Sequence, residues 1–336
     1  MSLTTNVHLT TLSMMDAEWE YNNSFSYNAT SFPYEDISSH KTPDYKSEEN
    51  LFFNLETFII MSILVICILG AVGNGIVIWL LGFCIKRNPF ITYILNLAIA
   101  DFGLLVSLII IVVVNESFGQ SYLSNIIFAL FFFLFLLMSS AGQFLLTAIS
   151  IDRCVAVFFP LWYRCRRQPH LSTVVCVLIW VLSTLLSFIT IIIQIINFHG
   201  NIIVKYYQLI VNAVLCLPFM TSAAVALFIK ACCKSQHQRG KLLTVILLTL
   251  LFFLFLAFPF NVLAILSFYN YIHLYFEVCA LALSCLNSSA NPLIYFLVGR
   301  ERKAGHRESL KLILQRVFKE EEGCAEELQP PAETQL

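Results

Sequence analysis

Seven apolar runs are the feature that most constrains how this chain can fold. Each reaches or exceeds the ~20 residues that a helix needs to cross a lipid bilayer. Hydrophobic residues make up 58% of the chain and charged residues only 12%, which is about half the charged fraction of a soluble domain. Because lipid cannot satisfy backbone polar groups, we expect an all-α membrane protein with a seven-transmembrane helix bundle. The runs lie at roughly 57–83, 90–114, 122–156, 171–195, 204–232, 241–267 and 273–298.

Positive charge is concentrated on one side of these runs. Of the 20 Lys and Arg residues, 17 lie near the C-terminal ends of the first, third, fifth and seventh runs or in the loops and tail that follow them. Loops that stay in the cytoplasm carry such an excess of Lys and Arg. We therefore expect a multi-pass membrane protein with its N-terminus outside and its C-terminus on the cytoplasmic side.

Residues 1–55 are polar and acidic, and we expect them to form a disordered extracellular tail. They include Asn22-Asn23-Ser24 and Asn28-Ala29-Thr30, which both have the Asn-X-Ser/Thr pattern of N-glycosylation. Asn22 and Asn28 are therefore predicted glycosylation sites.

The seventh run carries polar residues where a lipid-facing helix would carry aliphatic ones. It contains Asn287-Ser288-Ser289-Ala290-Asn291-Pro292-Leu293-Ile294-Tyr295. Polar groups inside a membrane are costly and usually face the protein interior or a water-filled cavity. Pro292 also removes one backbone donor and loosens the helix. This pattern indicates a polar, deformable segment that suits a switch, and a kinked structural helix is the plainer alternative.

Asp101 is the other polar residue that needs an explanation, because it lies deep in the second run. A buried carboxyl group needs a cation, a proton or hydrogen-bond donors around it. The chain shows no phosphate-binding glycine loop, no metal motif and no paired carboxylates, and its eleven Cys offer no obvious external disulfide. An enzyme is therefore not expected.

Taken together, these features resemble the rhodopsin-like G-protein-coupled receptors over residues 57–318. The matching residues, run by run, are Gly73-Asn74, Leu97-Ala98-Ile99-Ala100-Asp101, Asp152-Arg153-Cys154 with Pro160, Trp180, Pro218, Phe255 with Pro259, and Asn291-Pro292-Leu293-Ile294-Tyr295.

Within that class the chain is most similar to the Mas-related receptors. Two departures from the wider class fit this group: the third run has no Cys at its outer end, and Ala257 replaces the Trp that usually stands two residues before Pro259. The resembling stretches are Lys86-Arg87-Asn88-Pro89-Phe90, Leu146-Thr147-Ala148-Ile149-Ser150, Leu161-Trp162-Tyr163-Arg164-Cys165 and Asn287-Ser288-Ser289-Ala290-Asn291-Pro292.

The resemblance implies a receptor of the plasma membrane, with an extracellular N-terminus, whose membrane domain spans residues 56–298. It would bind an extracellular peptide or small-molecule ligand and activate heterotrimeric G-proteins of the Gq or Gi type. A polytopic transporter or channel is the alternative; it would be expected to show internal repeats, matched broken helices and several intramembrane charges.

The resemblance also assigns an activation switch. Arg153 is expected to pair with Asp152 at rest and to turn toward the G-protein and Tyr295 in the active state. Many relatives tether this Arg to a Glu at the foot of the sixth span, but the matching position here is Arg239. We therefore hypothesise measurable basal signalling. The expected switch residues are Asp152, Arg153, Asn291, Pro292, Tyr295, Pro259, Ala257, Pro218 and Arg239.

In similar receptors the residues around Asp101 hold a sodium ion that favours the inactive state. Asn74 and three residues of the seventh run are expected to converge on Asp101, and such oxygen-rich groups suit a hard cation. Gly142 stands where a Ser often helps, so a water-mediated network without an ion is the alternative. No other cofactor is expected. The expected sodium ligands are Asp101, Asn287, Ser288 and Asn291.

Ligand-binding residues are expected in the outer half of the runs. Phe135 stands where amine receptors carry an Asp, which argues against a biogenic amine. Thr190 and Tyr206 stand where some Mas-related receptors carry acids that bind cationic peptides. Ligand pockets are mostly apolar with a few placed polar groups. The candidates are Phe135, Ser139, Thr190, Tyr206, Gln208, Asn212, Asn261 and Glu277, of which Glu277 is the single acid.

The C-terminal region has three features. Residues 299–320 have apolar side chains at helical spacing between basic ones, which predicts an amphipathic eighth helix on the inner leaflet. Residues 321–336 form a cytoplasmic acidic tail. Its last residues, Thr334-Gln335-Leu336, fit a carboxyl-terminal ligand of a PDZ-domain protein.

Overall fold

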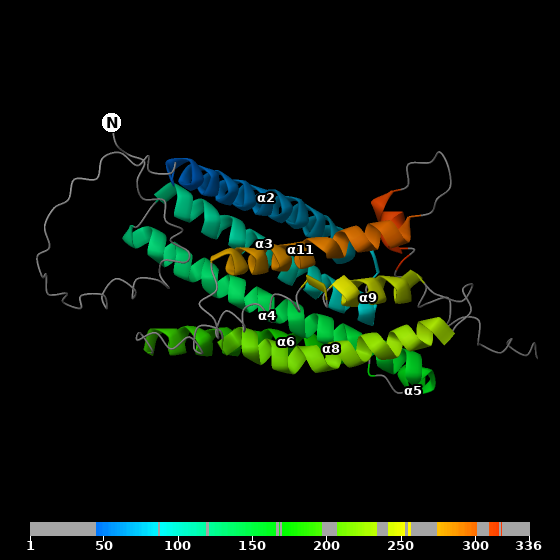
Figure 1. The fold of residues 1–336 in the computed structure, drawn as a ribbon. Coiled ribbons are helices and arrows are strands. Elements are labelled where there is room, and N and C mark those ends of the chain that lie inside the picture. The colour runs from blue at the N-terminus through cyan, green and yellow to red at the C-terminus, as the bar shows by residue number, and fades with distance from the viewer. Residues whose placement is uncertain are drawn as a thin grey trace, which may run out of the picture. The chain divides into compact units, whose positions relative to one another are not determined.

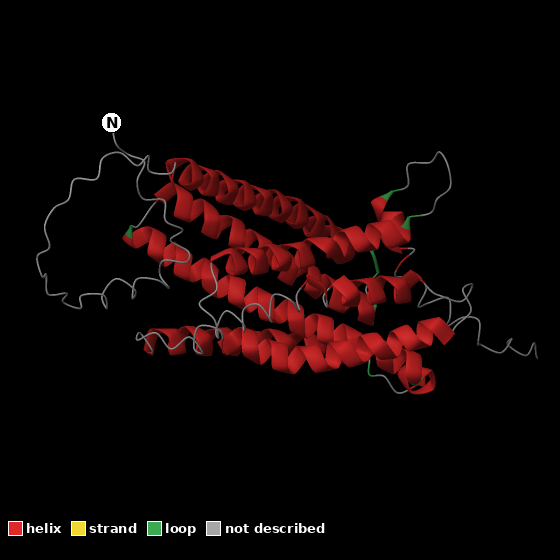
Figure 2. Cartoon of the chain, viewed as in Figure 1, coloured by secondary structure: helices red, strands yellow, loops and turns green. Residues whose placement is uncertain are grey.

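The structure is a computed structural model of the full chain. It describes residues 45–86, 88–118, 121–165, 168, 170–196, 207–233, 241–252, 255–256, 274–300, 309–315 and 317. Within these residues the secondary structure is helical, with short turns between helices and no strand (Figure 2). The chain divides into two compact units, residues 1–65 and 66–336, and the functional residues described below all lie in the second.

Figure 1 labels the described helices and colours them in chain order from blue to red. Their bounds are α2 Tyr45–Trp79, continued by the π-helix η1 Leu80–Cys84, then α3 Pro89–Phe118, α4 Tyr122–Phe158, α5 Pro160–Cys165, α6 Leu171–Ile196, α8 Tyr207–Cys233, α9 Lys241–Phe252 and α11 Leu274–Gly299.

Six of the predicted spans are present as helices that are long and apolar enough to cross a membrane. They correspond to the first five runs and the seventh. The remaining run, 241–267, is described as α9 up to Phe252 and as two further residues, so most of its second half lies outside the described part of the chain. The expected all-helical membrane architecture is thereby confirmed.

Helix α4 is the centre of the packing within residues 66–336. It lies against α3, α6 and α8, and more briefly against α5 and α9, while α11 packs on α3 and α9. Small residues make this close packing of α4 possible: Ser140, Ala141 and Gly142 are buried, as is the continuous stretch through Thr147. Small side chains at membrane helix interfaces let backbones approach closely.

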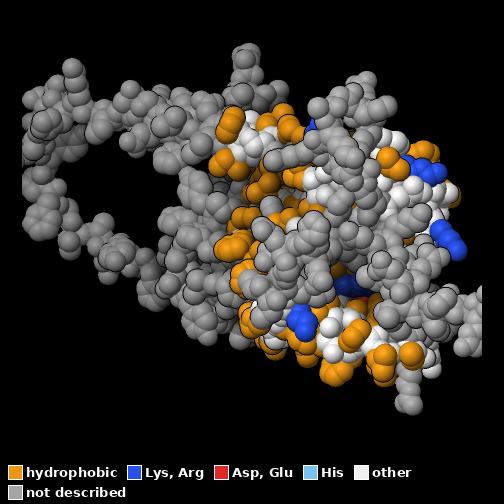
Figure 3. Space-filling model, turned by 90° about the vertical axis from the view of Figure 1, so that its right-hand side faces the viewer, with side chains coloured by type: hydrophobic (Ala, Val, Ile, Leu, Met, Phe, Trp, Pro, Cys, Tyr) orange, Lys and Arg blue, Asp and Glu red, His pale blue; other side chains and the backbone are white. Residues whose placement is uncertain are grey.

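Many aliphatic side chains point outward from these helices instead of into the core. On α6, for example, Val177, Leu178 and Leu185 are more than half exposed. Figure 3 shows hydrophobic side chains over much of the described surface in that view, with Lys and Arg side chains lying apart from one another. Such a surface suits lipid, because lipid tails are as apolar as these side chains.

One polar contact ties α3 to α6 inside the apolar packing. The indole Nε1 of Trp180 donates a hydrogen bond to Asn96 Oδ1 over 2.9 Å. A buried indole N–H usually finds such a partner. This contact helps to fix the rotation of both helices about their axes, and therefore the direction in which Asp101 projects, little more than one turn beyond Asn96.

Candidate functional site

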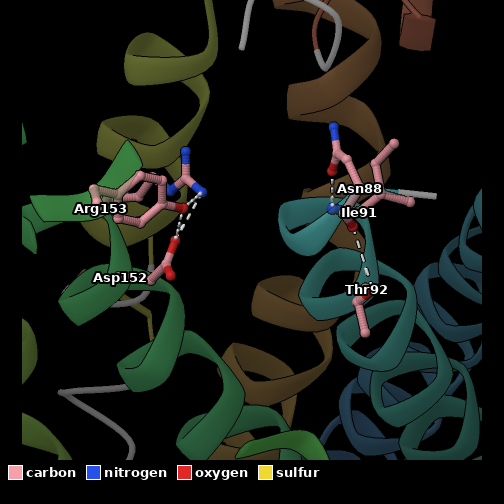
Figure 4. A network of polar contacts seen from close by, with 6 residues as sticks. Asn88, Ile91, Thr92, Asp152 and Arg153 are labelled. Carbon is pink, nitrogen blue, oxygen red and sulfur yellow. Dashed lines mark hydrogen bonds and ion pairs between the residues drawn. The ribbon is translucent and has the colours of Figure 1, made fainter. Parts of the chain in front are cut away.

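The N-terminus of α3 places an aromatic ring at one end of the helix packing. Asn88 precedes the helix, and its Oδ1 accepts a hydrogen bond from the backbone N–H of Ile91 over 2.7 Å (Figure 4). Asn is a preferred N-cap, and Pro89 follows at the first helical position, where its missing N–H costs nothing. This local sequence starts the helix at Pro89 and fixes Phe90, which is fully buried.

Asp152 and Arg153, at the C-terminal end of α4, form an ion pair with Nη2 and Oδ2 2.7 Å apart (Figure 4). Both side chains are largely buried, at 9% and 5% exposure. The guanidinium carbon of Arg153 also lies 4.0 Å from the centre of the Phe90 ring. An Arg over an aromatic face gains a cation–π attraction, which is stronger where water is excluded. The pair that was expected at rest is therefore present in this structure.

A third residue, Tyr163, joins this pair. Its hydroxyl donates to Asp152 Oδ2 over 3.0 Å and accepts from Arg153 Nη2 over 3.2 Å. We call Asp152, Arg153 and Tyr163 the α4–α5 cluster. Pro160 explains how Tyr163 reaches back, because a proline cannot continue α4 and instead starts the short helix α5.

Tyr163 belongs to a stretch that resembles the Mas-related receptors, but the sequence did not predict a role for it. The available signal was weak: a Pro eight residues after Asp152 predicts a turn, and a Tyr one helical turn later can face the helix that has just ended. Phe90 was missed in the same way.

A second polar layer lies where α2, α3 and α11 meet. Asn291 Nδ2 donates a hydrogen bond to Asp101 Oδ2 over 2.7 Å, and both residues are buried. Ser288 interacts with the same carboxyl group and is also buried. Three of the four residues expected around a sodium ion, Asp101, Ser288 and Asn291, are therefore brought together. Asn287 is half-buried in the same turn of α11.

Asn74 behaves differently from what was expected. Its Nδ2 donates to the backbone carbonyls of Gly70 and Ser288, each over 3.0 Å, and not to Asp101. Its buried Oδ1 has no hydrogen-bond partner within the described residues. The physical reason is the close approach of α2 to α11, which puts a carbonyl of α11 within reach before the carboxyl group of α3. Asn74 therefore holds α2 and α11 together.

Pro292 and Tyr295 continue this face of α11. A Cβ added at Gly73 would lie 3.2 Å from Pro292, so the two helices touch at this level. Tyr295 is 2% exposed and lines a small apolar cavity that has room for about one water molecule. Phe90 lines the same cavity and also carries the Arg153 guanidinium over its ring. The other lining residues are Ile94, Leu97, Leu146, Ile149, Val245, Ile246, Thr249 and Leu250.

The predicted ligand residues Gln208 and Asn212 are turned into the packing between α4, α6 and α8. Gln208 Nε2 lies 2.6 Å from Ser140 Oγ, 3.1 Å from Ser187 Oγ and 2.9 Å from the carbonyl of Leu136. Asn212 Nδ2 donates to the same Ser140 hydroxyl over 2.8 Å. The amide oxygens of both residues are buried without a partner in the part of the chain described.

The other candidate ligand residues do not converge on one described pocket. Thr190 is buried, and its hydroxyl donates to the carbonyl of Leu186 in its own helix. Phe135 and Ser139 are half-buried on α4, and the ring of Phe135 stacks on that of Phe132 at 6.5 Å. Sequence reasoning named Ser139 and missed Ser140. The serines of α6 at helical spacing, Ser183 and Ser187, were a usable signal for a polar face between helices.

Several predicted residues lie outside the described part of the chain. Pro218 is described; it is exposed in the interior of α8. Within the described residues no group of three or more His, Cys, Asp or Glu could hold a metal ion. The predicted residues that are not described are Asn22, Asn28, Tyr206, Arg239, Ala257, Pro259, Asn261 and Thr334-Gln335-Leu336, together with the side chain of Glu277.

Comparisons with known proteins identify the family. Residues 73–295 match the family described as 7 transmembrane receptor (rhodopsin family). Mas-related G-protein coupled receptor member H of Rattus norvegicus is 38% identical over 305 residues, which cover 83% of this chain and 89% of the relative.

Two further relatives agree. Mas-related G-protein coupled receptor member X1 of Homo sapiens is 35% identical over 300 residues, or 84% of this chain and 90% of the relative. Proto-oncogene Mas of Mus musculus is 37% identical over 267 residues, or 75% and 81%. These relatives are receptors and not enzymes. The chain therefore belongs to the rhodopsin family of seven-transmembrane receptors and, within it, to the Mas-related G-protein coupled receptors.

Proposed function

We propose that this receptor lies in the plasma membrane with its N-terminus outside, binds an extracellular peptide or small molecule, and activates heterotrimeric G-proteins of the Gq or Gi type. Two observations support the orientation. The Lys and Arg residues gather at and beyond the C-terminal ends of the odd-numbered spans. The two predicted glycosylation sites, Asn22 and Asn28, lie at the opposite end of the chain from that basic tail.

The α4–α5 cluster is the observation that carries the coupling proposal. Arg153 is a buried cation held by a carboxylate, a hydroxyl and an aromatic ring at the end of α4 that we place at the cytoplasm. Such a group is stable in this closed arrangement and costly to leave unpaired. A ligand that favours another packing of the helices would release Arg153 to a partner on the G-protein, which shifts an existing equilibrium.

Tyr295 provides the second half of the switch in this proposal. It lines the small cavity together with apolar residues of α9 and with Phe90, whose ring contacts Arg153. Pro292, one turn earlier, gives α11 a point at which to bend. Movement of α9 or α11 would open the cavity and let Tyr295 approach Arg153. Pro218 and Pro259 are proposed to contribute bends in α8 and in the sixth span, and Ala257 occupies the switch position where the wider class usually carries a Trp.

Basal signalling is part of the proposal because Arg239 occupies the position where many relatives have an acid that tethers the span-three Arg. A cation there would repel Arg153 instead of restraining it. Replacing Arg239 with Glu should lower the ligand-independent signal at equal surface expression. If the wild-type receptor and this variant are equally silent, the proposal of basal activity is wrong.

An allosteric sodium ion is proposed near Asp101. The donor set fits such an ion: a buried carboxylate and the Ser288 hydroxyl offer oxygen atoms, and the absence of a side chain at Gly142 leaves room beside Asp101 Oδ1. Asn287 and Asn291 would complete the set. When bound, the ion would supply positive charge that stabilises the ionised carboxyl group and favours the packing seen here.

The ligand would bind on the extracellular side of the polar contacts formed by Gln208, Asn212 and Ser140. Because these side chains face α4 and α6, we propose that Gln208 and Asn212 form the floor of the pocket and hold its walls together. Phe135 and Ser139 on α4 would face the ligand more directly, and Glu277 would attract a cationic group on it. Thr190, Tyr206 and Asn261 complete the proposed lining.

We further propose that residues 299–320 form the amphipathic eighth helix. Residues 310–315 are helical, and Ile313 and Val317 are buried against the end of α11, within 2.7 Å of where a Cβ on Gly299 would lie. Leu310 and Leu312 are 43% and 47% exposed and would face lipid. Thr334-Gln335-Leu336 is proposed to bind a PDZ-domain protein.

Second-messenger output tests the proposed function. The receptor would be expressed with chimeric G-proteins, at graded surface densities, and screened with basic peptides and small molecules. Inositol phosphate or cyclic AMP changes that scale with receptor density are expected. Arg153→Ala should abolish them, whereas Lys86→Ala, which removes an exposed cation on the same side, should preserve them. A signal that survives Arg153→Ala would contradict the proposed coupling.

A further inference from the structure

Helices α2 and α11 approach each other closely at two successive levels, one at Ser289 and one at Pro292. Ser289 Oγ donates to the carbonyl of Ile66 over 3.3 Å. A Cβ added at Gly70 would meet the Ser289 side chain, with only 2.7 Å to its Cβ, and a Cβ at Gly73 would lie 3.2 Å from Pro292. Because Gly70 faces Ser289 and Gly73 faces Pro292, the two helices run parallel with the same residue offset at both levels.

About one turn nearer the N-terminal ends of both segments, Cys67 of α2 and Cys285 of α11 interact with each other. Both side chains are completely buried, at 0% exposure. The two thiols are close enough to interact with each other, and neither is part of a disulfide. A disulfide requires short distances between both the α-carbons and the β-carbons of its two cysteines. The glycines let α2 and α11 come close enough for that requirement to be met between two different helices.

Two other cysteines of the helix packing, the buried Cys216 and the half-buried Cys154, have partners that are not cysteines. Cys216 on α8 interacts with Thr147. Cys154 Sγ lies 3.8 Å from the carbonyl of Ala223. The contact between Cys67 and Cys285 therefore joins two groups that can form a covalent bond with each other.

We propose that Cys67 and Cys285 form a reversible redox site, a dithiol that a small neutral oxidant such as hydrogen peroxide converts to a disulfide joining α2 to α11. Nothing in the proposed ligand or G-protein site uses these two residues. The link would lie within two turns of Asp101–Asn291 and Pro292, so it would restrict the segment of α11 that the proposed switch needs to move.

The chemistry balances with peroxide as the single co-reactant. One thiol attacks the peroxide O–O bond, forms a sulfenic acid and releases water. The second thiol then attacks the sulfenic sulfur, forms the S–S bond and releases a second water, so that two thiols lose two electrons and peroxide gains them. A neutral oxidant is required because the site is buried in the membrane-spanning region. A dithiol reductant such as dithiothreitol reverses the step by thiol–disulfide exchange.

The test uses the full-length receptor in cell membranes treated with hydrogen peroxide, denatured, alkylated and digested with chymotrypsin for mass spectrometry. We expect a linked pair of peptides containing Cys67 and Cys285, which disappears after dithiothreitol. Cys67→Ser and Cys285→Ser keep side-chain size and hydrogen bonding but should abolish the link. Cys216→Ser, at a buried thiol elsewhere, should not affect it.

The exposed Cys165 reports that the oxidant acted. The redox site is refuted if Cys165 is oxidised while Cys67 and Cys285 are both recovered as alkylated, and therefore reduced, thiols. It is also refuted if Cys285 is linked to another cysteine. The effect on signalling rests on the proposed function. We expect peroxide to lower the wild-type signal by about fivefold or more and to leave that of Cys67→Ser unchanged. A link without this loss would overturn the regulatory role while leaving the site intact, and loss of coupling itself is tested separately by Arg153→Ala.

Discussion

Tyr163→Phe is the substitution that tests the α4–α5 cluster most directly. It removes one hydroxyl, which donates to Asp152 over 3.0 Å and accepts from Arg153 over 3.2 Å, and keeps the aromatic ring. The ion pair between Asp152 and Arg153 would remain, with its 2.7 Å distance. The substitution therefore weakens the closed arrangement without leaving a buried charge unpaired.

The size of the effect follows from those contacts. A hydrogen bond to a charged group contributes about 1.5–3 kcal/mol. The hydroxyl makes two such contacts, but both are long and the ion pair is retained, so we count them together as one hydrogen bond. Because 1.4 kcal/mol is a factor of ten, the equilibrium between closed and open states should shift by roughly 10- to 100-fold toward the open state. A minor state populated at about 0.1–1% would then become a readily measured one.

The assay is ligand-independent second-messenger output at matched surface expression. Tyr163→Phe should raise it about tenfold or more relative to the wild-type receptor. Trp162→Phe, the neighbouring residue in the same helix, is 47% exposed and serves as the matched control that should stay at the wild-type level. In an Asp152→Asn background the effect of Tyr163→Phe should shrink, because the two groups act on the same contact.

Two results would refute this reasoning. An unchanged basal signal in Tyr163→Phe would mean that the hydroxyl does not help to hold the resting state. Fully additive effects with Asp152→Asn would mean that the two residues act separately, and that their proximity in the structure has no energetic consequence.

Three other substitutions test other parts of the structure. Sodium chloride should raise the thermal unfolding temperature of the wild-type receptor relative to N-methylglucamine chloride at equal ionic strength. Asp101→Asn should remove this difference because it removes the charge that would hold the cation. A variant that sodium still stabilises would contradict the proposed site. Gln208→Leu should lower the free energy of unfolding by about 1–3 kcal/mol, since the buried groups around it lose their donor, and an unchanged unfolding temperature in detergent would count against this. Gly70→Ala should lower the free energy of unfolding by about 1–3 kcal/mol because its Cβ would meet Ser289. Gly82→Ala is the control, since a Cβ there would meet nothing within 4 Å and should not destabilise the receptor. Equal losses of stability in the two variants would exclude the close helix contact as the cause.

The helices and their composition were predictable because they depend on local sequence. An apolar run of more than about 20 residues has few alternatives to a spanning helix. Caps and prolines carry a local signal of the same kind, although it was not used for the prediction: Asn88 and Pro89 mark the start of α3, and Pro160 begins α5 after α4 has ended. The ion pair of Asp152 and Arg153 was expected as well, since adjacent residues of opposite charge need little tertiary information to meet.

Partner choice between helices was only partly predictable. Asp101 and Asn291 were expected together, and the structure places them 2.7 Å apart. Asn74 was expected in the same group but donates to carbonyls of α2 and α11. Gln208 was expected to face a ligand but faces Ser140. In each case a polar residue certainly needed a partner, and several were available within one helical turn.

The sequence by itself therefore determined that this chain spans the membrane many times, where the spans lie, and that the buried polar groups within them must be satisfied by other protein groups. Only the tertiary structure decided which groups satisfy them. The physical reason is that the rotation and depth of each helix are set by packing against its neighbours, such as the glycine contacts of α2 with α11 and the bond from Trp180 to Asn96. If one helix were shifted by one residue relative to its neighbour, a different pair of side chains would meet. The periodicity of a single helix does not contain this information.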